Sequence, residues 1–177
     1  MRHLVLLCIA ALLSLSQAQT TTATCQPLNE TTVRGFFNLW NNALATLNST
    51  TVASRYARRA VLLPTVSDTP RNTNALIVDY FNSFLLKKPQ GVILSGDITI
   101  GCNWAQDAGI YEFTMGKDGS KVKARYSYVY VWEDNSWKIS HHHSSVMPEG
   151  FLAGSSSAGF LKTSLFMIAG LIFFGLF

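Results

Sequence analysis

Two strand-like runs joined by a short polar loop, in residues 121–148, constrain the fold of this chain more than any other stretch. Both runs are rich in β-branched and aromatic residues, and the loop over residues 133–136 is polar, a combination that strongly predicts a β-hairpin. The second run contains three adjacent histidines, His141, His142 and His143. We therefore expect these histidines to lie on a strand and to alternate between its two faces.

The first 18 residues have the layout of a secretory signal peptide. Arg2 and His3 give a basic start, residues 4–15 form a short apolar core, and Ser16 and Ala18 are small residues at the −3 and −1 positions of a cleavage site. An uncleaved signal anchor is the alternative. The short apolar core and the polar lead over residues 19–30 favour cleavage.

The C-terminal end has the layout of a glycosylphosphatidylinositol (GPI) attachment signal. Residues 150–164 form a small-residue linker that contains the attachment region, and residues 165–177 are uniformly apolar. A retained transmembrane helix is the alternative, but such a tail rises only about 20 Å in a helix, against a hydrocarbon core of about 30 Å. We expect a lipid anchor, attached at Gly154, Ser155 or Ser156, that holds the protein on the extracellular face of the plasma membrane.

Removal of both ends would leave about 137 residues, the size of one domain with one core. That part keeps 12 of the 14 basic residues and all ten acidic ones, so its net charge is about +2. A charge that is so small and so scattered argues against a nucleic-acid partner.

Cys25 and Cys102 are the two cysteines that remain when Cys8 leaves with the signal peptide. In an oxidising compartment we expect them to form a disulfide, and two unpaired thiols are the alternative. Asn29 and Asn48 begin Asn-X-Thr sequons on either side of the first predicted helix. They are candidate glycosylation sites in a secreted protein.

The order of predicted elements is helices first and strands afterwards. Apolar residues recur at helical spacing in residues 31–47 and 72–88, with a shorter helix between them that is capped by residues 48–50 and extends to about residue 58. Thr31 or Thr32 is the expected N-cap of the first helix. Strands are expected over residues 60–65, 91–103 and 108–115 and in the two arms of the hairpin.

The strand over residues 91–103 shows alternation of its β-branched residues. Val92, Leu94, Ile98 and Ile100 share one parity, and Ile93 has the other. Together these elements predict a single α+β domain over residues 31–149, with N-terminal helices packed on a curved antiparallel sheet.

Several motifs occur in order through this domain. They are Val61-Leu62-Leu63-Pro64-Thr65, Tyr80-Phe81 followed by Lys88-Pro89-Gln90-Gly91, Asp107-Ala108-Gly109-Ile110-Tyr111, Ala124-Arg125-Tyr126 and His142-His143-Ser144-Ser145-Val146-Met147-Pro148. Together they resemble the association-domain family of calcium/calmodulin-dependent protein kinase type II, and most closely its stand-alone bacterial-type members.

The resemblance covers residues 33–149. It implies a nuclear transport factor 2-like cone, with a deep pocket between sheet and helices and an outer sheet face that forms dimers or larger rings. The sequence carries no kinase catalytic motif.

Strand alternation divides the candidate site residues between two faces. His141 and His143 point away from the pocket and are candidates for a subunit contact. Pocket candidates are Tyr56, Asp107, Glu112, Arg125, Tyr128, His142 and Ser144. The resemblance implies arginines in the pocket of the kinase domain, and at those positions this chain has Glu112, Tyr128 and Ser144. An anion pocket of that type is therefore in doubt, with Arg125 as a different source of positive charge.

The three histidines also invite a metal-site interpretation. Alternation leaves at most two of them on one face, so we expect hydrogen-bonding histidines, no metal and no other cofactor. An acid/base interpretation pairs His142 with Glu112 inside the cone, with Tyr56 or Tyr128 orienting a substrate. The alternative is a hydrogen-bonded core network.

Two functions therefore remain open. The first is a non-catalytic, self-associating domain at the outer membrane surface, whose cone binds a small ligand or has lost that role. The second is a small cofactor-independent isomerase or lyase that acts through His142, Glu112 and Arg125. We expect the first.

Overall fold

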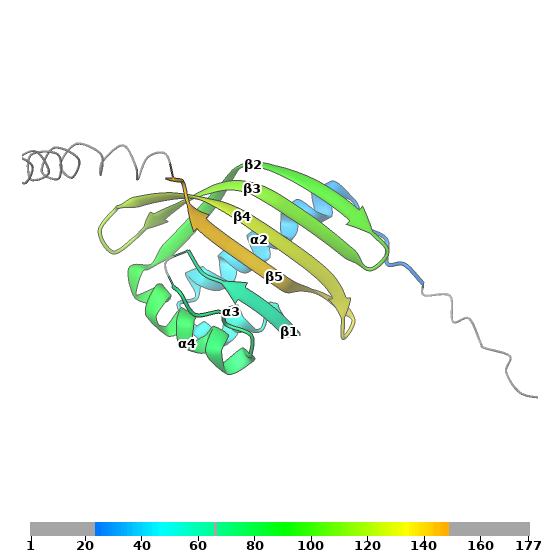
Figure 1. Cartoon of the computed structure of the whole chain (residues 1–177), viewed down its shortest axis with the longest axis horizontal. Helices are drawn as coiled ribbons and strands as arrows, with labels where there is room; N and C mark the ends of the chain where they lie inside the picture. The colour runs from blue at the N-terminus through cyan, green and yellow to red at the C-terminus, as the bar shows by residue number, and fades with distance from the viewer. Residues whose placement is uncertain (1–23, 66, 149–177) are drawn as a thin grey trace, which may run out of the picture.

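The computed structural model describes residues 24–65 and 67–148, and the expected signal peptide, linker and C-terminal tail lie outside these residues. Three helices pack on one face of a five-stranded sheet with the strand order β1-β5-β4-β3-β2 (Figure 1). The elements in chain order are α2 (Glu30–Ala45), α3 (Ser49–Ala53), β1 (Tyr56–Leu63), α4 (Asn74–Phe84), the 3₁₀ turn η1 (Leu85–Lys87), β2 (Pro89–Gly101), β3 (Trp104–Met115), β4 (Lys121–Glu133) and β5 (Ser136–Val146). The predicted α+β fold is confirmed.

The sheet is an antiparallel meander from β2 to β5, and β1 joins its edge in parallel to β5. This parallel edge was not predicted, since the sequence pattern indicated an antiparallel sheet. Parallel neighbours need a long connection, and the whole of α4 and β2–β4 lies between β1 and β5 in the chain. The pairing places Leu62 opposite His142.

Asparagine side chains, rather than threonines, begin the first two helices. Asn29 Oδ1 accepts a hydrogen bond from the backbone N–H of Thr32 at 2.9 Å, and Asn48 Oδ1 accepts one from Thr51 at 3.0 Å. The predicted caps at Thr31 or Thr32 are therefore wrong, because the asparagine side chain reaches the free N–H groups of the first turn. The second helix is also shorter than predicted, since Tyr56 already belongs to β1.

The hairpin between β4 and β5 turns more tightly than predicted. Asp134 and Asn135 both have positive φ angles, 50° and 56°, so they make a two-residue turn that matches the twist of the strands. The turn pairs Tyr130 with Ile139, and a β-bulge between Val129 and Tyr130 then shifts the register so that Tyr128 pairs with His142. The inner face of the sheet is consequently lined by tyrosines that pack against the helices.

A β-bulge in β2 changes the predicted alternation. The register shifts between Ile93 and Ser95, so Ile93 and Ile98 both pack against the core although their parities differ. Val92 and Leu94 are 58% and 50% exposed. The predicted grouping of Leu94 with Ile98 is therefore wrong, because a bulge inserts one residue and exchanges the two faces beyond it.

The N-terminal lead is attached to the turn between β2 and β3. Cys25 and Cys102 form a disulfide, the predicted pairing. Asn103 supports it, since its side chain accepts from the backbone N–H of Gln26 at 2.8 Å and donates to the carbonyl of Thr24 at 3.0 Å.

Candidate functional site

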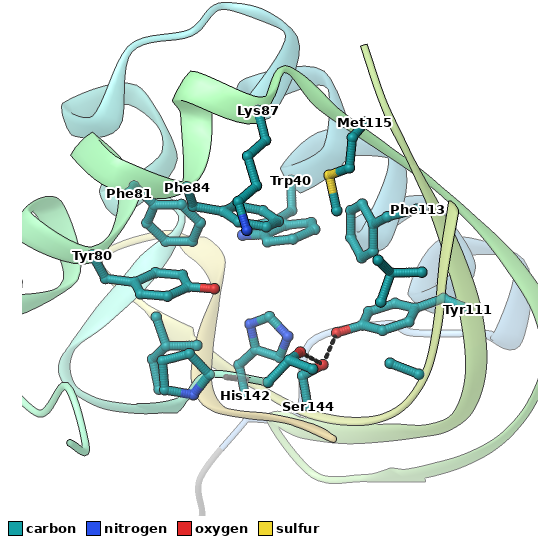
Figure 2. A pocket seen from close by; sticks show the side chains of 15 residues that line it. Trp40, Tyr80, Phe81, Phe84, Lys87, Tyr111, Phe113, Met115, His142 and Ser144 are labelled. Atoms are coloured by element: carbon teal, nitrogen blue, oxygen red, sulfur yellow. Dashed lines mark hydrogen bonds between the residues drawn. The ribbon is translucent and has the colours of Figure 1, made fainter. Parts of the chain in front are cut away.

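A cavity of about 110 Å³ lies between the inner face of the sheet and α4 (Figure 2). Its walls are mostly apolar and aromatic, from Trp40, Leu62, Pro64, Phe81, Phe84, Phe113, Met115, Val122 and Ala124. The polar groups that line it are Thr65, Tyr80, Lys87, Tyr111, His142 and Ser144. An apolar cavity with a few polar groups is the usual form of a small-molecule site.

His142 lies at the floor of this cavity. The residue is 4% exposed. Its ring stacks on the ring of Tyr128, with 4.2 Å between the ring centroids, and makes a T-shaped contact with Trp40, with 5.3 Å between the centroids. Burial lowers the pKa of His142 to about 3, with smaller contributions from His141 and His143. The imidazole is therefore neutral at physiological pH.

A chain of hydrogen bonds sets which nitrogen of His142 carries the proton. Trp40 Nε1 lies 3.1 Å from the Tyr56 hydroxyl, which lies 2.9 Å from His142 Nδ1. An indole N–H can only donate, so the Tyr56 oxygen accepts from it, and donation of the Tyr56 proton to Nδ1 is the arrangement that leaves the buried Tyr56 O–H paired. His142 Nε2 must then carry a hydrogen, and this buried atom has no hydrogen-bond partner among the described residues.

Three of the other hydroxyl groups of the cavity hydrogen-bond to one another. The Tyr111 hydroxyl donates to Ser144 Oγ at 2.5 Å, and Ser144 Oγ also hydrogen-bonds to Thr65 Oγ1 (Figure 2). Burial raises the pKa of Tyr111, and it raises that of Tyr80 to about 12. These hydroxyls stay protonated, so the cavity interior carries no charge.

Among the described residues that line the cavity, Lys87 alone is charged. Figure 2 shows its side chain reaching down from η1 toward the opening, between Phe84 and Met115. The residue is exposed, and among the described residues its ammonium group forms no ion pair. Its charge is therefore at the mouth, in contact with water.

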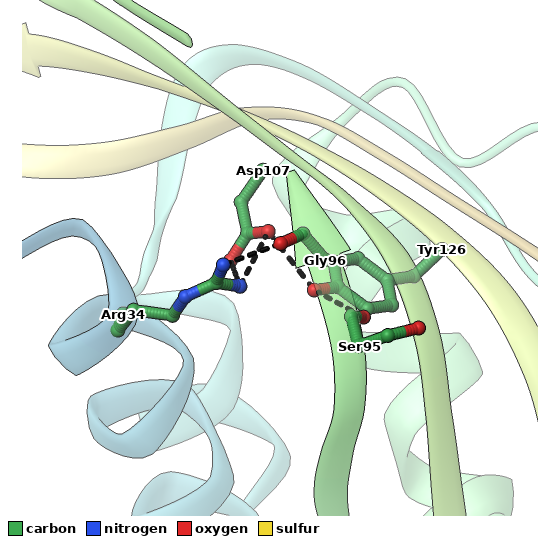
Figure 3. Close-up of polar contacts among 5 residues, drawn as sticks. All are labelled: Arg34, Ser95, Gly96, Asp107 and Tyr126. Carbon is green, nitrogen blue, oxygen red and sulfur yellow. Dashed lines mark hydrogen bonds and ion pairs between the residues drawn. The ribbon is translucent and has the colours of Figure 1, made fainter. Parts of the chain in front are cut away.

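A second polar cluster lies elsewhere on the inner face (Figure 3). The Asp107 carboxylate is fully buried, accepts from the Tyr126 hydroxyl at 2.9 Å and lies 3.2 Å from Arg34 Nη1. Arg34 also donates to the carbonyl of Gly96. Burial raises the pKa of Asp107, while Tyr126 and Arg34 oppose that rise. The cluster links α2 to β2, β3 and β4, and Asp107 does not line the cavity.

The family model for the calcium/calmodulin dependent protein kinase II association domain matches residues 29–148 of this chain. This chain belongs to that family. The expected resemblance is thereby confirmed, and we refer to the described part of the chain as the association domain.

Solved structures agree with this assignment. A protein from Xanthomonas campestris assigned to the same domain is 42% identical, with a TM-score of 0.65, and the match covers 73% of this chain and 99% of that one. A nuclear transport factor 2-like protein of unknown function from Pseudomonas putida is 12% identical, with a TM-score of 0.59 and coverage of 69% and 89%. A search of curated proteins found no match.

The iota-carbonic anhydrase of a cyanobacterium, solved with bicarbonate, is also similar in fold. It is 18% identical, with a TM-score of 0.62 over 72% of this chain and 98% of that one. At that identity the likeness extends to the fold of the association domain and not to its site.

The association domain does not bring Glu112 to His142, and this predicted pair is wrong. Tyr111 and Phe113 point into the cavity, so Glu112 between them points to the outer face. Its Oε1 atom lies 3.1 Å from Lys121 Nζ. An acid/base pair made of His142 and Glu112 therefore does not exist in this fold.

Arg125 is also misplaced by the prediction. It is exposed on the outer face of β4, where its Nε donates to Ser145 Oγ at 3.2 Å. The two neighbouring positions, Ala124 and Tyr126, are the buried ones. The cavity consequently receives no arginine from β4.

Two predicted pocket residues support the cavity from behind. Tyr56 and Tyr128 are fully buried against His142 but do not line the cavity wall. Ser144 and His142 do line it, whereas His141 and His143 are half-buried on the opposite face of β5. Among the described residues, no group of three histidine, cysteine, aspartate or glutamate side chains could hold a metal ion.

Four polar residues of the cavity were not among the predicted site residues. Thr65 and Tyr80 lie within the quoted family motifs, and Tyr111 has the same parity as Asp107, so these signals were present in the sequence. No pattern pointed to Lys87, because its position depends on how η1 ends against β2.

Proposed function

We propose that the association domain is a self-associating module that is displayed on the extracellular face of the plasma membrane. Its membership in an association-domain family supports self-association, and the observation that carries the proposal is the outer face of the sheet, which none of the described helices covers. All three helices lie on the opposite face (Figure 1).

The middle of that outer face is uncharged from β3 to β1, and the exposed Asp97 lies beside Ala108 on the edge strand β2. Across β3, β4, β5 and β1, the register aligns Gln106, Val129, His141 and Val61 in one row and Ala108, Ser127, His143 and Leu63 in the next. Charged residues, including Glu112, Lys123 and Arg125, lie toward one end of the face. Trp104 and Val131 lie opposite each other at the other end, and Trp104 is 41% exposed.

A second copy of the same face fits this composition. An isologous contact places the uncharged rows of two sheets together and leaves the charged ends at the rim. The predicted roles of His141 and His143 as interface residues follow from their place in these rows. The isomerase or lyase alternative is not favoured, because Glu112 lies on the outer face.

Light scattering on residues 24–148 tests self-association. The Xanthomonas relative consists almost entirely of the matched domain, which indicates that the domain folds without further segments. We expect a dimer or larger ring at micromolar concentration. Val129→Lys should dissociate it, because the new charge lies in the middle of the face, and Asn82→Lys on α4 is the matched control. A monomeric unchanged domain would contradict the proposal.

The lipid anchor is the second part of the proposal. The layout of residues 150–177 supports it, and among the described residues no helix is long and apolar enough to span a bilayer. Phosphatidylinositol-specific phospholipase C should release the full-length protein from the surface of expressing cells. Full retention after a treatment that releases a known GPI-anchored protein would argue for a transmembrane tail.

A further inference from the structure

Among the described residues, the inner cavity holds an unpaired hydrogen-bond donor in an uncharged interior, and the proposed self-association does not involve it. We propose that it binds a small uncharged molecule with an apolar body and one hydrogen-bond-accepting oxygen, such as a ketone, whose oxygen accepts the hydrogen of His142 Nε2. This site lies on the opposite side of the sheet from the proposed subunit contact, so each proposal can fail without the other.

The unpartnered donor is the first argument. Tyr56 holds His142 in the form that carries its hydrogen on Nε2, and that atom is buried without a partner among the described residues. An unsatisfied buried donor costs free energy that a single acceptor recovers. Ser144, Tyr111 and Thr65 already bond to one another, so among the described residues that line the cavity Nε2 is the fully buried polar atom that a ligand would satisfy.

The lack of charge in the interior is the second argument. A buried carboxylate needs a cation beside it, and Lys87 offers one only at the exposed mouth. A buried amine needs a carboxylate, and none lines the cavity. An amine would lose water without gaining a carboxylate, and a carboxylate would have only the exposed charge of Lys87 to balance its own, so the interior favours an uncharged ligand.

The size and the walls are the third argument. An apolar cavity of about 150 Å³ is enough to bind benzene, and this cavity measures about 110 Å³. Trp40, Phe81 and Phe113 supply flat aromatic walls that suit a ring or a short branched chain. Because this volume is below the one that binds benzene, the ligand is no larger than a single ring.

Three probes separate the possible sources of affinity. Cyclohexanone carries the ring and the acceptor, methylcyclohexane carries the ring alone, and cyclohexanecarboxylate adds a charge. We expect titration calorimetry or ligand-observed NMR on residues 24–148 to show cyclohexanone binding about fivefold more tightly than methylcyclohexane. The carboxylate should bind more weakly than both. No binding of cyclohexanone at millimolar concentration, equal binding of methylcyclohexane, or tighter binding of the carboxylate would each overturn the proposal.

His142→Phe is the decisive variant, because it keeps an aromatic ring and removes the donor. It should lower cyclohexanone affinity to the level of methylcyclohexane and leave methylcyclohexane binding in place. Asn82→Phe, at an exposed position of α4 that does not line the cavity, is the control and should change neither. An unchanged preference for cyclohexanone in His142→Phe would contradict the assigned donor.

Tyr56→Phe tests the same donor if His142→Phe fails to fold. Tyr56 is a positioning residue, since it acts through His142 Nδ1. The imidazole ¹⁵N signals of His142 should show hydrogen on Nε2 in the unchanged domain and a mixture of the two neutral forms in Tyr56→Phe, with a partial loss of cyclohexanone affinity. A His142 signal with hydrogen on Nδ1 in the unchanged domain would overturn the proposal.

Discussion

At the scale of single residues, three neighbouring histidines have different surroundings because a strand alternates its faces. His142 is enclosed by Trp40, Tyr56 and Tyr128, whereas His141 and His143 are half-buried on the outer face. Burial also lowers the pKa of His141. The same side chain is thus a neutral donor in the cavity and a surface group one position away.

This difference predicts how stability depends on pH. The pKa of His142 is about 3 in the folded domain and about 6.5 in the unfolded chain, so below pH 6.5 only the unfolded chain takes up this proton. The contribution of His142 to stability is therefore complete above pH 6.5 and is lost as the pH falls toward 3. Because of His142, the free energy of unfolding should be about 2 kcal/mol lower at pH 5 than at pH 7.

Urea denaturation at pH 7 and pH 5 measures this loss. The pH-dependent loss in the unchanged domain should exceed that in His142→Phe by about 2 kcal/mol. Asn82→Ala, at an exposed position of α4 that removes no titratable group, serves as the control variant. Equal losses in the unchanged domain and His142→Phe would show that His142 takes up its proton in the folded state as easily as in the unfolded chain.

At the scale of secondary structure elements, the two predicted glycosylation sites are also helix caps. The Oδ1 atoms of Asn29 and Asn48 accept the cap hydrogen bonds, and an N-linked glycan is attached to the side-chain nitrogen, so one asparagine can serve both roles. Removing the asparagine therefore removes more than a glycan.

Two substitutions that destroy the first sequon separate these roles. Asn29→Ala should lower the free energy of unfolding by about 1 kcal/mol in protein from a host that adds no glycans, because α2 loses its cap. Thr31→Ala, at an exposed position within the helix, should change it by less than about half of that. Thermal or urea unfolding measures both. Equal stabilities of the two variants would mean that the cap contributes nothing.

At the scale of the whole molecule, the chain closes its cone from several distant segments. α2 contacts the sheet through the cluster of Arg34 and Asp107, and the N-terminal lead is joined to the turn between β2 and β3 by the disulfide. The disulfide encloses α2, α3, β1, α4 and β2, with a sequence separation of 77. It therefore restricts the unfolded chain over more than half of the domain.

Loss of this crosslink should lower stability substantially. The double variant Cys25→Ser/Cys102→Ser should unfold with about 4 kcal/mol less free energy than the unchanged domain, because a long loop is freed in the unfolded chain. Urea denaturation of the unchanged domain with a reducing agent should give the same value as the double variant. A loss below about 1 kcal/mol would show that the lead contributes little beyond its own contacts.

Local periodicity and turn residues were enough to predict the hairpin, the separation of His142 from its neighbours and the α+β class. The family motifs added the overall cone. The bulge in β2 and the parallel edge formed by β1 could be seen only in the folded domain, since neither leaves a period in the sequence.

The cavity shows the same division. Alternation separated His142 and Ser144 from His141 and His143 from the sequence alone, but a bulge at Ser140 puts Ile139 on the same inner face as His142, and the partner that orients His142 is Tyr56, 86 residues away. The same rule, applied to β3 with its neighbours Tyr111 and Phe113, would have placed Glu112 outside. Contacts between distant segments depend on strand register and helix ends, which local sequence patterns do not encode, and so the tertiary structure alone decided what the cavity can bind.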